Sequence, residues 1–301
     1  MYSFLDFFAG SGLAGEGLKP FFRTVWANDI CEKKARVYAA NHSSECFVTG
    51  PIQEIDGKNL PAAVLSWASF PCQDLSLAGM QGGIRAERSG LFWEWLRVMD
   101  QMAAFPPVLV VENVSGLVSL GAGKNYRILH NSLVAKGFQV GPVMLNAEKW
   151  LPQSRPRVFV IAVRDDIEIS EFIDSKPGWA HPRSLQKAAA GLEKSVWWKI
   201  PEPAEKKMEL KDIVDFEAPC IKEENARRTL DLIKPEHFRK LKDAVKKGAN
   251  VFPGYKRTRN GKQVLELRFD GIAGCLRTPN GGSSRQFLVI VDKGRLKARL
   301  L

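Results

Sequence analysis

A cysteine at the end of a predicted strand is the residue of this sequence best suited to nucleophilic chemistry. The apolar run Ala62–Trp67 predicts a short buried strand, and Pro71 ends the extended chain directly before Cys72 and Gln73. The thiol is therefore expected at the exposed carboxyl end of a strand. A thiol on a loop beside polar groups can ionise and act as a nucleophile, whereas a buried thiol is inert. The alternative is that Cys72 is only a small residue at the end of a strand.

An acid and two arginines flank other predicted strands. The apolar run Pro107–Val111 predicts a buried strand, and Glu112-Asn-Val114 follows it directly. Further along the chain, Gln153-Ser-Arg155-Pro-Arg157 comes just before a predicted strand at 158–163. A carboxyl group can donate a proton during a reaction, and a guanidinium group can stabilise developing negative charge. Without Cys72, the same residues would be interpreted as a turn cap and a surface patch.

A glycine-rich turn near the N-terminus predicts a nucleotide site. The apolar run Ser3–Phe8 is followed by Ala9-Gly10-Ser-Gly12-Leu-Ala-Gly15, which matches the pattern Gly-x-Gly-x-x-Gly. Glycines let the backbone approach a ligand, and the start of the next helix offers free N–H groups. The following strand ends at Asp29, where an acidic side chain would reach a ribose. A nicotinamide-dependent oxidoreductase is one interpretation, and helix capping is a further role for Asp29.

The order of predicted elements indicates the fold class. Strand and helix patterns alternate to about residue 164, after which the sequence becomes rich in charge and broken by prolines. This pattern is typical of an α/β fold with a doubly wound, mostly parallel sheet of the Rossmann-like type. We place a domain boundary at residue 170 and expect a second, smaller, basic domain after it.

The charge distribution favours a polyanionic partner. The chain of 301 residues has a formal net charge of +11, but residues 1–180 carry a net charge of −1 and residues 181–301 a net charge of +12. A neutral part joined to a basic part suggests a catalytic body with a segment that binds nucleic acid. The alternative is a lysine-rich surface that is merely solvated.

Two polar loops of the basic part carry side chains suited to a nucleic acid. Tyr255–Gly261 predicts a hairpin turn with three cations and an asparagine, and Leu276–Arg285 is a second, glycine-rich loop. Arginine fits guanine and asparagine fits adenine, so such loops could read a groove. Contact with phosphates, or simple solvation, are the alternatives.

Cysteine usage and hydropathy exclude several classes of protein. The five cysteines are scattered and odd in number, which argues against a disulfide framework and favours a reducing compartment. No Cys-x-x-Cys spacing supports a metal site, and none is expected. No apolar run is long enough to cross a bilayer, and Met1–Phe8 lacks the features of a signal peptide. We therefore expect a protein of the cytoplasm, without a membrane partner.

Four stretches together resemble the DNA (cytosine-5) methyltransferases of the bacterial modification type. They are Phe8-Ala-Gly-Ser-Gly12, Pro71-Cys72-Gln73, Glu112-Asn-Val114 and Gln153-x-Arg155-x-Arg157, in this order. The resemblance implies S-adenosylmethionine as cofactor and, as substrate, a cytosine flipped out of specific double-stranded DNA. It further implies a catalytic and cofactor-binding domain at 1–170, a target-recognition domain at 171–290, and at 291–301 the start of a return to the first domain.

The resemblance also implies roles for individual residues. Cys72 is the nucleophile that forms a covalent adduct, Glu112 contacts ring nitrogen 3 and Arg155 holds the carbonyl oxygen of the base, with Gln73 and Arg157 beside them. The segment Met80–Ser89 is expected to act as a lid over the flipped base. The residues expected to line the cofactor site are Phe8, Ala9, Gly10, Gly12, Asp29, Ile30, Ile52, Pro71 and Leu91. The side chains expected to contact DNA are Ser76, Arg85, Arg88, Lys256, Arg257, Arg259, Asn260, Arg277, Ser283 and Arg285.

Two departures from the family pattern leave alternatives open. Pro51 stands where the family has an aspartate that contacts the adenine amine, and proline offers neither an acceptor side chain nor an N–H group. The sequence ends at Arg299-Leu300-Leu301, where the last family motifs would begin. Either the chain is truncated or a second polypeptide supplies these motifs, and we expect weak or no activity from the chain alone. A non-catalytic DNA-binding subunit and an RNA cytosine methyltransferase are the remaining interpretations.

Overall fold

The structure is a computed structural model of the chain, and it describes residues 1–71, 90–205, 208–218, 221, 223–276, 286–292 and 294–300. Contacts divide the chain into two compact units. Unit 1 comprises Met1–Leu145 and Arg157–Pro201, and unit 2 comprises Asn146–Pro156 and Glu202–Leu301. The expected boundary lay at residue 170, whereas in this division 171–201 lies with unit 1 and 146–156 with unit 2.

Unit 1 is built on a seven-stranded sheet with the strand order β3-β2-β1-β4-β5-β7-β6. The strands from β3 to β5 run parallel, and β7 is antiparallel to β5. The prediction of a doubly wound, mostly parallel sheet is confirmed. Strands β2 and β3 are added on one side of β1, and β4 and the later strands on the other side. The strand order therefore reverses between β1 and β4. Folds of this kind bind ligands at such a point of reversal. The strands are β1 (Tyr2–Phe7), β2 (Phe22–Asp29), β3 (Phe47–Thr49), β4 (Leu65–Ala68), β5 (Val108–Val114), β6 (Phe138–Asn146) and β7 (Pro156–Arg164).

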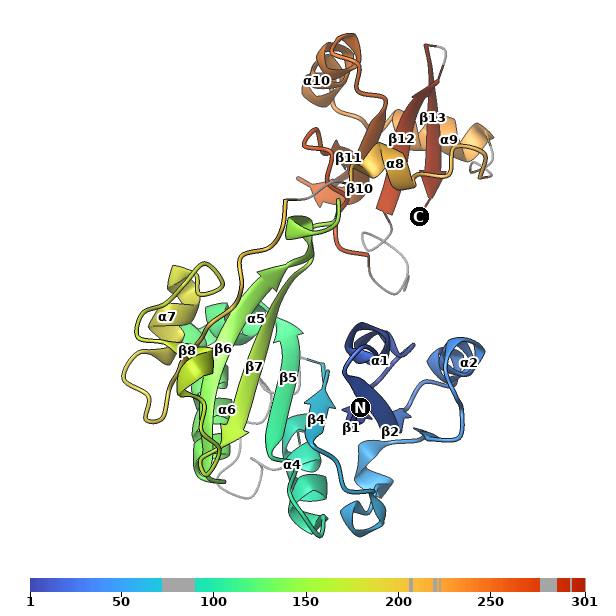
Figure 1. Cartoon of the computed structure of the whole chain (residues 1–301). Helices are drawn as coiled ribbons and strands as arrows, with labels where there is room; N and C mark the ends of the chain where they lie inside the picture. The colour runs from blue at the N-terminus through green and yellow to red at the C-terminus, as the bar shows by residue number, and fades with distance from the viewer. Residues whose placement is uncertain are drawn as a thin grey trace. The chain divides into compact units, whose positions relative to one another are not determined.

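Helices α4, α5 and α6 lie behind this sheet in the view of Figure 1. The buried strand residues Phe7, Leu109 and Val111 share one apolar core with Trp95 of α4 and Tyr126 of α6. These helices form because their apolar residues recur at helical spacing and are buried on one side. The helices and short turns of unit 1 are α1 (Leu13–Leu18), α2 (Glu32–Asn41), η1 (Ile52–Glu54), η2 (Gly57–Asn59), α4 (Leu91–Gln101), α5 (Gly116–Ser119), η3 (Leu120–Gly123), α6 (Lys124–Val134), η5 (Ser170–Phe172) and α7 (Arg183–Ala189).

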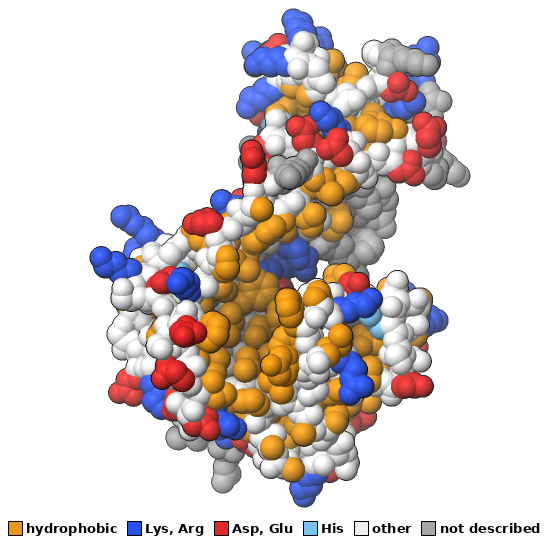
Figure 2. Space-filling view, in the orientation of Figure 1, with side chains coloured by type: hydrophobic (Ala, Val, Ile, Leu, Met, Phe, Trp, Pro, Cys, Tyr) orange, Lys and Arg blue, Asp and Glu red, His pale blue; other side chains and the backbone are white. Residues whose placement is uncertain are grey.

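The opposite face of the sheet also carries apolar side chains. Phe4, Leu65 and Val110 are buried there, and Trp67 and Phe159 pack against them while remaining partly exposed. Figure 2 shows hydrophobic side chains gathered in a hollow over β4, β5 and β7. This face is therefore a broad apolar surface beside the strands that carry the candidate site.

A small two-stranded sheet completes unit 1. Strands β8 (Ile173–Asp174) and β9 (Trp197–Trp198) pair antiparallel. The Trp198 ring is buried with Val143 and Val163, and its indole N–H donates to the carbonyl oxygen of Gly141 at 2.9 Å. Residues beyond 170 thus complete a core against β6 and β7.

Unit 2 is a separate antiparallel sheet with the strand order β11-β10-β12-β13. The hairpin turn expected within Tyr255–Gly261 is confirmed, with Asn260 and Gly261 at φ 49° and 76° between β10 and β11. Asn-Gly suits such a turn because both central positions need positive φ. The core of the unit includes Phe252, Leu265 and Val289. The elements are η4 (Ala147–Lys149), α8 (Leu210–Ile213), α9 (Glu223–Leu230), α10 (Pro235–Lys246), β10 (Val251–Arg259), β11 (Lys262–Leu267), β12 (Gln286–Asp292) and β13 (Arg295–Leu300).

Every helix among the described residues is too short or too polar to cross a lipid bilayer. Within the same residues, no three His, Cys, Asp or Glu side chains gather in a way that could hold a metal ion.

Candidate active site

The turn after β1 has an unusual backbone. Phe8, Gly10 and Gly12 adopt φ values of 60°, 61° and 86°. Positive φ is costly for a bulky residue such as phenylalanine, and such strain is typical of ligand sites. The Ala9 N–H donates to the carbonyl oxygen of Asn28 at 2.8 Å, which holds the turn across the end of β2. The predicted glycine turn is thus formed at the carboxyl end of β1.

The two glycines of this turn serve different needs. A Cβ atom on Gly12 would overlap the His42 ring, so Gly12 is required by close packing as well as by its φ. A Cβ atom on Gly10 would have Cδ of Lys34 as its nearest neighbour, at 3.8 Å. A Cβ atom would fit there at ordinary contact distance, so Gly10 is required by its φ of 61° and not by close packing.

Asp29 joins the turn to the start of α2. Its Oδ2 atom accepts from the Gly10 N–H at 3.0 Å and from Nζ of Lys34 at 3.4 Å, and its Oδ1 accepts from the Cys31 N–H at 2.9 Å. A carboxylate has about four acceptor positions, so these bonds leave about one for a ligand hydroxyl. The next residue, Ile30, is 69% exposed at the same strand end.

Asp6 is a buried acid that the sequence analysis did not single out. It is 1% exposed, and neither carboxyl oxygen has a hydrogen-bond partner among the described residues. Burial, assisted by the charge of Asp29, raises the pKa of Asp6 to about 8. The sequence feature that could have pointed to Asp6 is an acidic residue inside an apolar strand, two positions before Phe8.

The ends of β4 and β5 are tied together next to the turn. Asn113 Nδ2 donates to the carbonyl oxygen of Phe70 at 3.1 Å, and the Phe70 ring meets the Phe8 ring edge-on at 6.1 Å. Asn113 thus fixes the chain just before Cys72, a role that Glu112-Asn-Val114 alone did not suggest. Pro71 is exposed at this point, and Leu91, at the start of α4, is half-buried.

The wall formed by Pro51 and Ile52 lies after β3. Pro51 precedes the one-turn helix η1 and is half-buried. The Ile52 side chain is only 2% exposed and belongs to the main core of unit 1. Ile52 therefore anchors this wall from behind.

Glu112 forms an ion pair with Arg157. Antiparallel pairing places Val114 of β5 opposite Arg157 of β7, and Nε of Arg157 lies 2.7 Å from Oε1 of Glu112. The two side chains are only 20% and 17% exposed, so the pair is largely shielded from water. The result is an oriented carboxylate and guanidinium at the carboxyl end of β5.

Arg155, two residues earlier, has different surroundings. Its N–H donates to Oδ1 of Asn146 at 2.7 Å, and Nη1 donates to the carbonyl oxygen of Leu276 at 3.4 Å and lies 3.5 Å from Sγ of Cys275. Ser154 and Ala273 are also joined, by an N–H to carbonyl bond of 2.8 Å. The structure thus brings Arg157 to Glu112, and it places Arg155 among residues of unit 2.

The hairpin of unit 2 carries cations that are partly neutralised. Arg259 forms two bonds to Glu266 on the facing strand, at 2.7 and 3.2 Å, and these bonds lower the pKa of Glu266. Nε of Arg257 lies 3.7 Å from the same carboxylate. Nζ of Lys256 lies 5.0 Å from the centre of the Phe287 ring. Asn260 occupies the exposed turn.

Several predicted residues, and the predicted lid at 80–89, lie outside the described part of the chain. These residues are Cys72, Gln73, Ser76, Arg85, Arg88, Arg277, Ser283 and Arg285.

Comparison with known proteins identifies similar chains. A family model described as C-5 cytosine-specific DNA methylase matches residues 2–277. The chain is 31% identical over 170 residues to the Type II methyltransferase M.Bsp6I of Bacillus sp. (strain RFL6), covering 55% of this chain and 53% of that protein. It is 30% identical over 178 residues to the Type II methyltransferase M.HhaI of Haemophilus parahaemolyticus, covering 58% of this chain and 53% of that protein. The chain thus spans about half the length of these curated relatives.

Among solved structures, the S. pombe Dnmt2 methyltransferase has a similar fold. The similarity has a TM-score of 0.52 at 18% identity and covers 77% of this chain and 67% of that one.

Proposed function

The chain belongs to the C-5 cytosine-specific DNA methylase family, and we propose that it transfers a methyl group from S-adenosylmethionine to carbon 5 of cytosine in double-stranded DNA. The observation that carries the proposal is the Glu112–Arg157 pair, at 2.7 Å, at the carboxyl end of the strand beside β4. The segment that contains Cys72 continues from β4 in the sequence.

The residues around the turn after β1 fit the cofactor. Gly10 provides a backbone turn without a side chain, Asp29 retains acceptor capacity for a ribose hydroxyl, and Ile30 offers an exposed apolar side chain. We assign Phe8, Ala9, Gly12, Ile52, Pro71 and Leu91 to the same site. When bound, S-adenosylmethionine supplies the methyl group in electrophilic form.

The chain's own residues would activate the base. The Cys72 thiolate adds to carbon 6 of the cytosine, which makes carbon 5 nucleophilic. Glu112 protonates or hydrogen-bonds ring nitrogen 3. The resemblance gives the carbonyl oxygen of the base to Arg155; because Arg157 is the arginine fixed beside Glu112, we give that role to Arg157 instead. Once carbon 5 carries the methyl group, its proton is lost to water or hydroxide and the Cys72 thiolate is eliminated, which restores the aromatic ring. Arg155 and Gln73 are assigned to positions around the base.

Access to the base would require flipping. Carbon 6 of a paired cytosine cannot be reached inside a duplex, so the target must leave the stack. We assign DNA contact to Lys256, Arg257, Arg259 and Asn260 of the hairpin, to Arg277, Ser283 and Arg285, and to Ser76, Arg85 and Arg88. The net charge of +12 of residues 181–301 supports this partner.

Further polypeptide would complete the enzyme. The apolar sheet face around Phe4, Trp67 and Phe159 supports the proposal that additional chain, from the same or a second polypeptide, covers it. We expect weak or no activity from this chain alone and strong activity with a completing polypeptide. Full activity without one would contradict this part of the proposal.

Methyl transfer can be measured directly. Radiolabelled S-adenosylmethionine is incubated with double-stranded DNA or with transfer RNA, each with and without a candidate completing polypeptide. Label should appear at carbon 5 of cytosine in DNA, and Cys72→Ala should abolish it while DNA binding persists. Label found only in RNA would redirect the proposal to an RNA substrate, and transfer retained by Cys72→Ala would defeat the mechanism.

A further inference from the structure

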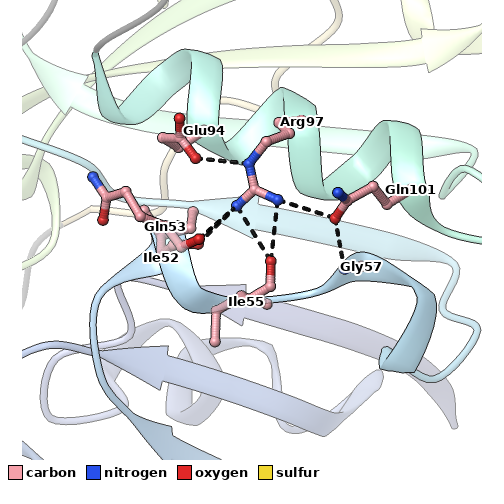
Figure 3. Close-up of polar contacts among 7 residues, drawn as sticks. All are labelled: Ile52, Gln53, Ile55, Gly57, Glu94, Arg97 and Gln101. Atoms are coloured by element: carbon pink, nitrogen blue, oxygen red, sulfur yellow. Dashed lines mark hydrogen bonds and ion pairs between the residues drawn. The ribbon is translucent and has the colours of Figure 1, made fainter.

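Arg97 of α4 makes an unusually complete set of contacts. Nε of Arg97 lies 2.7 Å from Oε2 of Glu94, and Nη1 donates to Oε1 of Gln101 at 3.0 Å. Nη2 donates to the carbonyl oxygens of Ile52 at 3.0 Å and Gln53 at 3.4 Å. Both Nη1 and Nη2 also donate to the carbonyl oxygen of Ile55, each at 3.2 Å. Figure 3 shows this fan of bonds between the helix and the turn.

Within the turn, the carbonyl oxygen of Ile52 already accepts from the Ile55 N–H at 3.1 Å, and Arg97 adds donors to it and to the carbonyl oxygens of Gln53 and Ile55. A one-turn helix leaves its last carbonyl groups without internal partners, and a guanidinium group has several donors in a fixed plane. Arg97 therefore caps η1 from the side. A lysine has the charge but not the planar arrangement, so it could reach only part of this set.

The neighbouring contacts make the junction tight. The Gly57 N–H donates to Oε1 of Gln101 at 3.0 Å, and this oxygen also accepts from Arg97. A Cβ atom on Gly57 would overlap the carbonyl oxygen of Val98, so the segment after η1 runs directly against α4. The wall at Pro51 and Ile52 thus depends on α4 for its position.

From these contacts we infer that Arg97 is a positioning residue for the cofactor, holding the Pro51–Ile52 wall against α4. The inference rests on the proposed function, because it takes this wall as part of the cofactor site. Pro51 has no polar side chain with which to bind the cofactor, so the wall must act through its backbone and its shape. Contacts of that kind depend on accurate placement.

The test compares two Arg97 variants with a control at another contact of α4, the ion pair that Lys136 forms with Asp100 of this helix. Arg97→Met removes every donor, and Arg97→Lys keeps the charge. Lys136→Met removes the ion pair between Nζ of Lys136 and Oδ1 of Asp100, at 2.6 Å, which also joins α4 to another part of unit 1 but lies apart from η1. Each protein is titrated calorimetrically with S-adenosylhomocysteine, and its melting temperature is recorded.

Arg97→Met is expected to raise the Kd for S-adenosylhomocysteine by about tenfold or more. Arg97→Lys should recover part of the loss, and Lys136→Met should bind like wild type. In the methyl-transfer assay, the KM for S-adenosylmethionine should rise while kcat at saturation stays within about twofold of wild type, because the chemical groups are untouched.

Two other results are distinguishable. If the wild-type protein binds S-adenosylhomocysteine and both Arg97 variants bind it with the same affinity, the inference is overturned and the proposed function stands. No binding by the wild-type chain, either alone or together with a completing polypeptide, would overturn both. If Arg97→Met fails to fold, Arg97→Lys with a normal melting temperature decides, and a fall in kcat without a rise in KM would refute positioning of the cofactor.

Discussion

Asn in place of Asp6 should change how the stability of the chain depends on pH. Asp6 is 1% exposed without a hydrogen-bond partner among the described residues, and burial together with the charge of Asp29 raises its pKa from 3.8 to about 8. Asparagine has nearly the same shape but does not ionise. The Asp6→Asn variant therefore removes one titration and leaves the packing of β1 almost unchanged.

The magnitude follows from the two pKa values. Between about pH 4 and pH 8 the carboxyl group is charged in the unfolded chain and protonated in the folded one, so the free energy of unfolding falls as the pH rises. Above the folded pKa the loss levels off. At about 1.4 kcal/mol for each pKa unit, the upper estimate of the total loss is about 6 kcal/mol, and that of the part between pH 5 and pH 8 is about 4 kcal/mol.

Urea unfolding at pH 5, 6, 7 and 8 measures this effect. The difference in free energy of unfolding between Asp6→Asn and wild type should grow in favour of the variant by up to about 4 kcal/mol across the series. Groups that do not interact with Asp6 titrate alike in both proteins and cancel. A difference that stays constant with pH would refute the argument that Asp6 is buried as an unpartnered acid.

Three further substitutions test the site and its surroundings. Glu112→Gln should slow methyl transfer by at least about a hundredfold without abolishing it, as judged by single-turnover rates, and an unchanged rate would remove Glu112 from the chemistry. Gly12→Ala should lower the free energy of unfolding by about 2–4 kcal/mol, because its Cβ atom would overlap the His42 ring at a φ of 86°; thermal unfolding that matches wild type would contradict this packing. Glu266→Gln should release Arg259 and steepen the salt dependence of DNA binding by about one counterion, whereas an unchanged slope would place the hairpin outside the DNA interface.

The fold could be predicted from sequence because local pattern and global architecture agree in unit 1. The run Val108–Val111 is apolar throughout, with Val108 half-buried and Leu109–Val111 buried, as expected for a central strand of a parallel sheet. The glycine turn was predictable because positive φ at Gly10 and Gly12 leaves a direct mark on the sequence.

Which of the two arginines pairs with Glu112 was not predictable, and the sequence analysis had given the contact with the base to Arg155, with Arg157 beside it. Arg155 and Arg157 are equivalent in the sequence, and only the antiparallel register that sets Val114 opposite Arg157 brings the second one to Glu112. Strand register between segments some 40 residues apart is a tertiary property. The contacts of Arg97 with carbonyl groups of residues 52–55 are of the same kind, because backbone acceptors carry no sequence signature.

Trapping on DNA that contains 5-fluorocytosine tests the central claim most directly. Fluorine at carbon 5 cannot leave as a proton does, so an enzyme that attacks carbon 6 remains bound covalently to the base. The account predicts a protein–DNA species that survives denaturing electrophoresis, requires S-adenosylmethionine, and disappears in Cys72→Ala. Methyl transfer to ordinary cytosine without any trapped species, or trapping that persists in Cys72→Ala, would contradict it.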